Sequence, residues 1–138
     1  MTHYTDPLPD HTSLAVFAGD ELIFTSGEKW LHPLFSLEAF LSAYTGERSL
    51  LSAHDTAAGK AAAILMARLG IRRAHINLVS DLAVAVYEKS GITLSYDRKI
   101  DRLLCKTEEL LSSMDDEEEI YRLLKERAVR AKEGTLAR

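Results

Sequence analysis

Most of the side chains that could take part in chemistry lie in one short stretch of the chain. In order, the residues are His54, Asp55, Thr56, Gly59 and Lys60. An imidazole, a carboxyl group and an ammonium group this close together could bind a metal ion, transfer protons or hold an anion. Which of these roles is possible depends on the elements that position the residues.

The Gly59-Lys60 pair resembles the end of a phosphate-binding loop. A P-loop reads Gly-x-x-x-x-Gly-Lys-Ser/Thr, because its glycine-rich backbone cradles phosphates and its hydroxyl group contacts Mg²⁺. With Gly59 and Lys60 in register, the first glycine would fall on His54 and the hydroxyl residue on Ala61. Neither position fits, so the sequence excludes a P-loop nucleotide site.

The first group of residues is predicted to lie at the start of a buried helix. Residues 56–69 are apolar on almost every side, and Gly70 supplies a stop signal. Residues 74–79 are typical of a buried strand, and Ser80-Asp81 is a suitable N-cap for a helix over 81–90. Both helices would begin at the carboxyl ends of parallel strands, where α/β domains bind ligands.

We therefore expect a ligand site between these two helix N-termini. Free backbone N–H groups at a helix start favour an anion, and the ammonium group of Lys60 would contact it. The sequence gives no assignment of catalytic residues, and no metal ion or cofactor is expected. The expected ligand is a small anionic or nucleotide-like molecule, and the expected binding residues are His54, Asp55, Thr56, Gly59, Lys60, Ser80 and Asp81.

Other roles are open to the same residues. Asp55 and the Ser80-Asp81 pair are ordinary helix N-caps. Histidines such as His54 and His75 are more often surface or hydrogen-bonded residues than ligands. Two further functions stay open: a metal-independent enzyme that uses Asp55 and Lys60 as an acid–base pair, and a structural domain that pairs with a protein partner or forms a homodimer.

The rest of the chain predicts a layered α/β domain. Alternating strands and helices favour a three-layer α-β-α fold, with a mixed sheet of five strands and about four helices on both faces. The pattern over 97–114 gives no clear element. The remaining predicted elements are an opening antiparallel hairpin around Gly19-Asp20, a helix from His32-Pro33 to Gly46, strands over 48–53 and 92–96, and a helix over 115–132.

Length, charge and composition limit the kind of protein. The 138 residues suit one domain, expected over 13–133, between a flexible leader of residues 1–12 and a flexible tail of residues 134–138. The net charge of −4 argues against binding to nucleic acid. Cys105 is the only cysteine, so no internal disulfide is expected. No signal peptide and no membrane span is recognised, and a cytoplasmic location is expected.

Three segments of the sequence read LAVFAGDELIFTSGEKWLHPLF, HDTAAGKAAAILMARLGI and LVSDLAVAVYEKSGITLSYDRKI. Over roughly residues 14–130 the chain resembles domain-of-unknown-function family 1893, a bacterial and archaeal family without an assigned function. The resemblance implies a cytidine-deaminase-like fold. Its most specific piece is Asp55 with Gly59-Lys60-Ala61-Ala62-Ala63, where the family pattern is Asp-Lys-x-x-Gly-Lys-Ala-Ala-Ala and Thr56 replaces the first lysine.

A second departure from the family lies further along the chain. Many members have Asn-Arg and then Cys-Pro-x-Glu, which we place on Cys105-Lys106 and on residues 112–115. In that register the family cysteine is absent, and a thiol-based function would not transfer to this chain.

The resemblance to deaminases does not extend to their zinc motifs. A zinc deaminase needs His-x-Glu at the start of its second core helix and Pro-Cys-x-x-Cys at the start of the third. Here the two helix starts read His54-Asp55-Thr56 and Val79-Ser80-Asp81-Leu82. Thr56 cannot transfer protons as a glutamate does, and His54 with Asp81 supplies too few ligands. Zinc-dependent deamination is therefore not expected.

Overall fold

The computed structural model describes the backbone of residues 3–136 and the side chains of residues 3–131. The described strands are β1 Leu14–Ala18, β2 Glu21–Ser26, β3 Leu51–Ala58, β4 Arg73–Ser80 and β5 Thr93–Ile100. The described α-helices are α1 His32–Ser42, α2 Lys60–Arg68, α3 Asp81–Lys89, α4 Lys106–Leu111 and α5 Glu117–Leu136, and a short 3-10 helix, η1 Arg48–Leu50, precedes β3.

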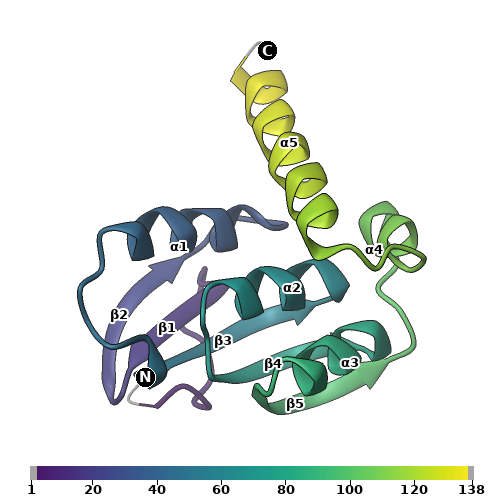
Figure 1. The fold of residues 1–138 in the computed structure, drawn as a ribbon. Helices are drawn as coiled ribbons and strands as arrows, with labels where there is room; N and C mark the ends of the chain where they lie inside the picture. Colours follow the sequence, from purple (N-terminus) through teal and green to yellow (C-terminus); the bar gives the residue numbers. More distant parts are fainter. Residues whose placement is uncertain (1–2, 137–138) are drawn as a thin grey trace.

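The strands form one mixed sheet in the order β2-β1-β3-β4-β5 (Figure 1). β1 runs antiparallel to both of its neighbours, whereas β3, β4 and β5 run parallel. Gly19 turns the opening hairpin with a φ of 60°, a left-handed backbone that glycine adopts without steric cost. The predicted α/β class, the five-stranded mixed sheet and its antiparallel opening hairpin are confirmed.

The helices pack against one face of the sheet. Each crossover, from β2 to β3, from β3 to β4 and from β4 to β5, moves the same way across the sheet, so right-handed connections place their helices on one side. We expected a second helical layer on the other face, and the described helices do not form one. Their buried side chains join a single core cluster, which includes Leu37 of α1, Ile64 of α2, Tyr87 of α3, Leu111 of α4 and Leu124 of α5.

The N-terminal segment, residues 3–12, contacts the opposite face of the sheet. It forms neither helix nor strand. The carbonyl oxygen of Tyr4 lies 2.9 Å from Nδ1 of His54 on β3, so this part of the expected leader is in contact with the domain. At the other end α5 continues to Leu136, so residues 134–136 of the expected tail are helical, and residues 137–138 lie outside the described residues.

β3 is longer than predicted, and this changes where the candidate residues lie. The prediction ended the strand before His54 and began the helix at Thr56, whereas β3 runs to Ala58 and α2 begins at Lys60. The parallel pairing with β4 continues to the end of β3, and these backbone contacts override the helix preference of the alanines. His54, Asp55 and Thr56 are therefore strand residues, and successive side chains lie on opposite faces of the sheet.

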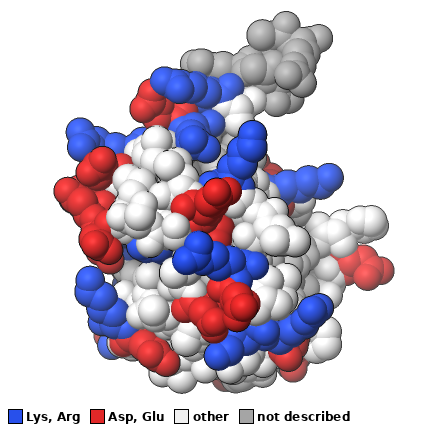
Figure 2. All heavy atoms as spheres, turned by 90° about the vertical axis from the view of Figure 1, so that its right-hand side faces the viewer, with Lys and Arg blue, Asp and Glu red and all other residues white. Residues whose placement is uncertain are grey.

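The last helix, α5, extends beyond its contacts with α1 and α2 and projects from the body of the domain (Figure 1). Basic and acidic side chains alternate over the face shown in Figure 2 and do not gather into a patch of one sign. No helix within residues 3–136 is both long enough and apolar enough to cross a membrane.

Candidate functional site

A cavity of about 320 Å³ opens between the start of α1, the end of β3 and the loop that leads into α4. This volume lies within the range of binding sites for small organic molecules. The wall combines apolar side chains with a few ionisable groups. The lining residues include Trp30, Leu31, Asp55, Gly59, Leu103 and Glu108.

Asp55 brings a buried carboxyl group to the cavity. It is 8% exposed and pairs with Leu14 of β1, a core residue, so it lies on the helix side of the sheet. Burial raises the pKa of Asp55 to about 7, although the backbone N–H groups of Ala57 and Thr56 act in the opposite direction. A carboxyl group that titrates near neutral pH in a cavity is typical of functional sites.

Glu108 supplies a second buried carboxyl group, and its oxygens meet the start of α2. It is 2% exposed, and it accepts hydrogen bonds from the backbone N–H groups of Lys60 at 2.8 Å and Leu103 at 3.1 Å. Gly59 permits this close approach, because a Cβ at that position would lie 2.9 Å from both carboxylate oxygens. A helix N-terminus favours a negative charge, and here the protein's own side chain supplies it.

Lys60 is directed away from the cavity. Its Nζ donates hydrogen bonds to the carbonyl oxygen of Leu111, the last residue of α4, at 2.9 Å and to that of Met114, three residues later, at 2.5 Å. Carbonyl groups at a helix C-terminus lack helical partners and favour a positive charge. Lys60 therefore connects α2 to the chain after α4, and it neither lines the cavity nor forms the expected acid–base pair with Asp55.

Lys60→Met should lower the free energy of unfolding by about 1–3 kcal/mol, because two carbonyl oxygens lose a charged donor. Methionine keeps the length of the side chain and removes its charge and hydrogen bonds. A urea titration measures the change. Lys106→Met, at an exposed position of α4, is the matched control and should have an effect below about 0.5 kcal/mol. An equally small effect of both substitutions would show that the Lys60 contacts do not stabilise the fold.

Trp30 forms the part of the cavity wall next to α1. Its backbone has a φ of 57°, in the left-handed region that bulky residues rarely adopt. Its side chain is 43% exposed, and its ring meets the ring of His32 edge-on at a centroid distance of 5.3 Å. Strained residues of this kind cluster at ligand sites. The indole ring offers a planar surface on which a ligand ring can stack.

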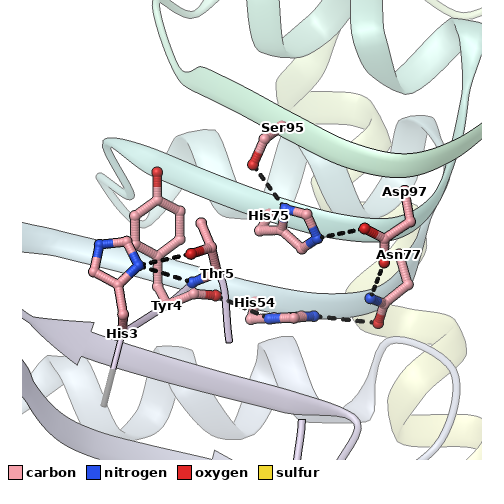
Figure 3. Close-up of polar contacts among 8 residues, drawn as sticks. All are labelled: His3, Tyr4, Thr5, His54, His75, Asn77, Ser95 and Asp97. Atoms are coloured by element: carbon pink, nitrogen blue, oxygen red, sulfur yellow. Dashed lines mark hydrogen bonds and ion pairs between the residues drawn. The ribbon is translucent and has the colours of Figure 1, made fainter. Parts of the chain in front are cut away.

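His54 lies on the face of the sheet opposite the cavity, in a row of polar side chains that crosses β3, β4 and β5 (Figure 3). Its Nε2 lies 3.2 Å from Oδ1 of Asn77. Asn77 donates from Nδ2 to Asp97 at 2.7 Å, and Asp97 lies 3.0 Å from Nε2 of His75. Both histidines therefore have hydrogen-bond partners within the protein, which is one of the ordinary roles considered for them from the sequence.

Ser95 completes this row, since its Oγ lies 2.7 Å from Nδ1 of His75. Ser95, His75 and Asp97 thus have the connectivity of a hydrolase triad. Ser95 and Asp97 are exposed on the edge strand β5, and the Nδ2 donor of Asn77 is already bonded to Asp97. A triad also needs donors directed at an oxyanion, so we interpret the row as structural.

Ser80 and Asp81 have local partners at the start of α3. Oγ of Ser80 accepts a hydrogen bond from the backbone N–H of Ala83 at 3.2 Å, which is an N-cap. Asp81 pairs with Lys99 of β5 at 3.2 Å. Neither residue lines the cavity. The structure thus brings Asp55, Thr56 and Gly59 together in the cavity wall and places His54, Lys60, Ser80 and Asp81 outside it.

Comparison with protein families agrees with the resemblance drawn from the sequence. The family model TM1506, described as a domain of unknown function (DUF1893), matches residues 8–128. The chain belongs to this family. No curated protein matches the chain.

A solved structure of another DUF1893 family protein, TM1506 from Thermotoga maritima, is similar to this one. The two sequences are 28% identical, and the superposition has a TM-score of 0.73. The match covers 84% of this chain and 80% of the other chain. The two DUF1893 proteins therefore share their fold over most of their lengths.

The residues of this DUF1893 protein do not fit a zinc centre. In the part of the chain that the structure describes, no group of three or more His, Cys, Asp or Glu side chains is placed to hold a metal ion. His54 lies in the polar row and Asp81 pairs with Lys99, so the two ligands considered from the sequence do not converge. The donor set therefore gives no support to a zinc-activated water.

Sequence reasoning missed Glu108 as a cavity residue, although one signal for it was present. Cys105 and Glu108 have the spacing of the family pattern Cys-Pro-x-Glu, with Lys106 in place of proline. Cys105 and Glu108 both line the cavity.

Proposed function

We propose that this DUF1893 protein binds a small planar molecule with N–H donors in the cavity between the starts of α1 and α2. The observation that supports this best is Asp55, a carboxyl group that is 8% exposed in the wall of a cavity of ligand size. Burying a carboxylate costs free energy unless it is paired with a donor or a positive charge. An N–H group of the ligand would supply that partner.

The charges of the wall favour an uncharged or cationic ligand over an anionic one. Glu28, Asp55 and Glu108 line the cavity, with Lys29 as the cation among its lining residues. A phosphate group would meet like charges, which is a strong element of discrimination. The sequence led us to expect a small anionic or nucleotide-like ligand. The charges of this cavity favour the ring of a nucleotide base and disfavour an anionic group.

The apolar part of the wall favours a flat ring. Trp30, Leu31 and Leu103 line the cavity, and a ring that stacks on the indole while its edge faces Asp55 would use both kinds of contact. If the ring is cationic, attraction to the indole face adds to the binding energy.

A thermal-shift screen tests the proposal. Benzamidine and the free bases cytosine, adenine and guanine serve as ring probes, and ribose 5-phosphate and inorganic phosphate serve as anionic probes. A ring probe at about 100 times its Kd should stabilise the folded protein by about 2.7 kcal/mol, because it binds only the native state. Stabilisation by the phosphates and by no ring would contradict the proposal.

Two variants locate the binding site within this screen. At pH 8, where the wild-type carboxyl group is ionised, Asp55→Asn should lose most of the shift given by a ring probe, because it removes the charge that faces the N–H donors. Lys60→Met should keep that shift, since Lys60 does not line the cavity. A shift that survives in Asp55→Asn and is lost in Lys60→Met would place the ligand beside Lys60 and contradict the proposal.

We also propose that the fold of this protein is cytidine-deaminase-like. The strand order β2-β1-β3-β4-β5, with β1 antiparallel to its neighbours, supports it. The protein would use such a fold without zinc deamination. A cytoplasmic location and a homodimer stay predictions from the sequence.

A further inference from the structure

We propose that the N-terminal segment, residues 3–12, is a clasp on the sheet that opens on acidification, when His54 gains a proton. The segment contacts His54 through Tyr4 (Figure 3). The side chain of His54 lies on the face of the sheet opposite that of Asp55 and the cavity, so this inference is independent of the proposed ligand. Residues 3–12 form neither helix nor strand, and such segments open locally at a lower free-energy cost than core elements.

The geometry around His54 fixes which atoms must donate. His54 is 1% exposed, and its Nδ1 lies 2.9 Å from the carbonyl oxygen of Tyr4, which can only accept. Asn77 donates from Nδ2 to the carboxylate of Asp97, so its Oδ1 is the atom that faces Nε2 of His54 at 3.2 Å. Both nitrogens of His54 therefore face acceptors, and a neutral imidazole can donate to one of them.

Two opposing effects decide what a second proton would do. It would give Asn77 a donor, and a hydrogen bond that replaces one to water contributes only modestly to stability. It would also place a charge at a buried position, which costs considerably more than one hydrogen bond returns. The ring of His75 lies 4.8 Å away between centroids, and a proton on both rings would add repulsion. The cost of the buried charge is the larger effect, so the closed clasp favours neutral His54.

The ionisable groups around His54 agree with this direction. Burial lowers the pKa of His54, the hydrogen bonds with Tyr4 and Asn77 raise it, and the positive charge of His75 lowers it further. Asp97 acts to raise it, but this carboxylate already accepts from Asn77 and lies within 3.0 Å of His75. His3, in the segment itself, contacts Thr5 rather than His54.

The direction of the pH effect follows from the lowered pKa of His54 in the closed state. In the open state His54 meets water, where a histidine titrates near its ordinary value of about 6.5. The open state therefore binds more protons than the closed state. The clasp is fully stable above the ordinary pKa of histidine and weakens as the pH falls below it.

Hydrogen–deuterium exchange of a peptide covering residues 3–12 tests the clasp. After correction for intrinsic exchange rates, the protection at pH 5.0 should be at least about threefold lower than at pH 7.5, because exchange follows the open population. His54→Asn keeps an uncharged N–H near the position of Nδ1, so its protection should not depend on pH. Exchange of β4 in the same samples reports whether each variant is folded.

His3→Gln is the matched control. His3 is an exposed histidine of the same segment, and it does not take part in the contact between Tyr4 and His54. The His3→Gln variant should lose protection at pH 5.0 as the wild-type protein does. An NMR titration of the wild-type imidazoles adds a test that needs no variant, and it should place the pKa of His54 below the ordinary histidine value of about 6.5. A pH response that persists in His54→Asn, or a pKa of His54 above the ordinary histidine value, would overturn the proposal.

Discussion

Asp55→Asn should make the protein more stable at pH 8, by up to about 4 kcal/mol in the free energy of unfolding. Most substitutions of a buried residue destabilise, so a gain of this size would be diagnostic. The physical reason is that burial raises the pKa of Asp55 to about 7, which means that the ionised carboxyl group opposes folding. Asparagine has nearly the same shape, can still accept from the backbone and never ionises.

The gain should depend on pH in a definite direction. Between about pH 4 and pH 7 the folded wild-type protein keeps a proton on Asp55 that the unfolded chain has released. The contribution of Asp55 to stability is therefore present at low pH and is lost as the pH rises to about 7. Asp55→Asn lacks this dependence, so its advantage should disappear below about pH 4.

Urea titrations at several pH values measure this difference. Asp20→Asn, in the exposed turn between β1 and β2, is the matched control, and its effect should stay below about 0.5 kcal/mol at every pH. If Asp55→Asn were less stable than the wild-type protein at pH 8, the carboxylate would be stabilised by its surroundings, and the account of the cavity would fail.

Glu108→Ala should destabilise the protein by about 3 kcal/mol, the second-largest effect expected. The substitution leaves the backbone N–H groups of Lys60 and Leu103 without their acceptor, and an unsatisfied buried donor costs about 1–3 kcal/mol. It also removes a negative charge from the start of α2. The urea concentration at the unfolding midpoint should fall. The dependence of the free energy of unfolding on urea concentration should not change, because the surface area exposed on unfolding stays the same.

Two further substitutions distinguish the loss of the Glu108 hydrogen bonds from a general effect on the stability of α4. Glu108→Gln keeps an acceptor oxygen and loses the charge, so its cost should lie between zero and that of Glu108→Ala. Glu109→Ala changes the exposed neighbour on the same helix and should cost less than about 0.5 kcal/mol. Equal effects at positions 108 and 109 would show that helix propensity, rather than the contact with α2, explains the loss.

The sequence predicted the fold well where periodicity and turn residues agree. The hairpin at Gly19-Asp20 and the helix that begins after Ser80 both follow from local signals. The helix start at Thr56 was wrong because β3 is held by pairing with β4, a contact distant in sequence. The prediction of helices on both faces of the sheet was wrong for a similar reason. The face that each helix covers depends on the direction in which the chain crosses the sheet between strands that are distant in sequence.

The candidate site was predicted in part. Asp55 was singled out, but as an N-cap or ligand contact, whereas it is a buried strand residue of the cavity wall. Lys60 was expected to contact a ligand because free N–H groups at a helix start favour an anion, whereas its Nζ donates to two carbonyl oxygens of the chain. Glu108 lies 48 residues further along the chain, and no local pattern could show that its carboxyl group meets the start of α2.

The central claim is that Asp55 presents a buried carboxyl group of high pKa to the cavity. NMR of protein labelled with ¹³C at the aspartate carboxyl carbons follows this group directly, with Asp55→Asn to assign its signal. The account predicts that the carboxyl carbon of Asp55 titrates with a pKa of about 7. Titration near pH 4, as for an aspartate in water, would contradict it.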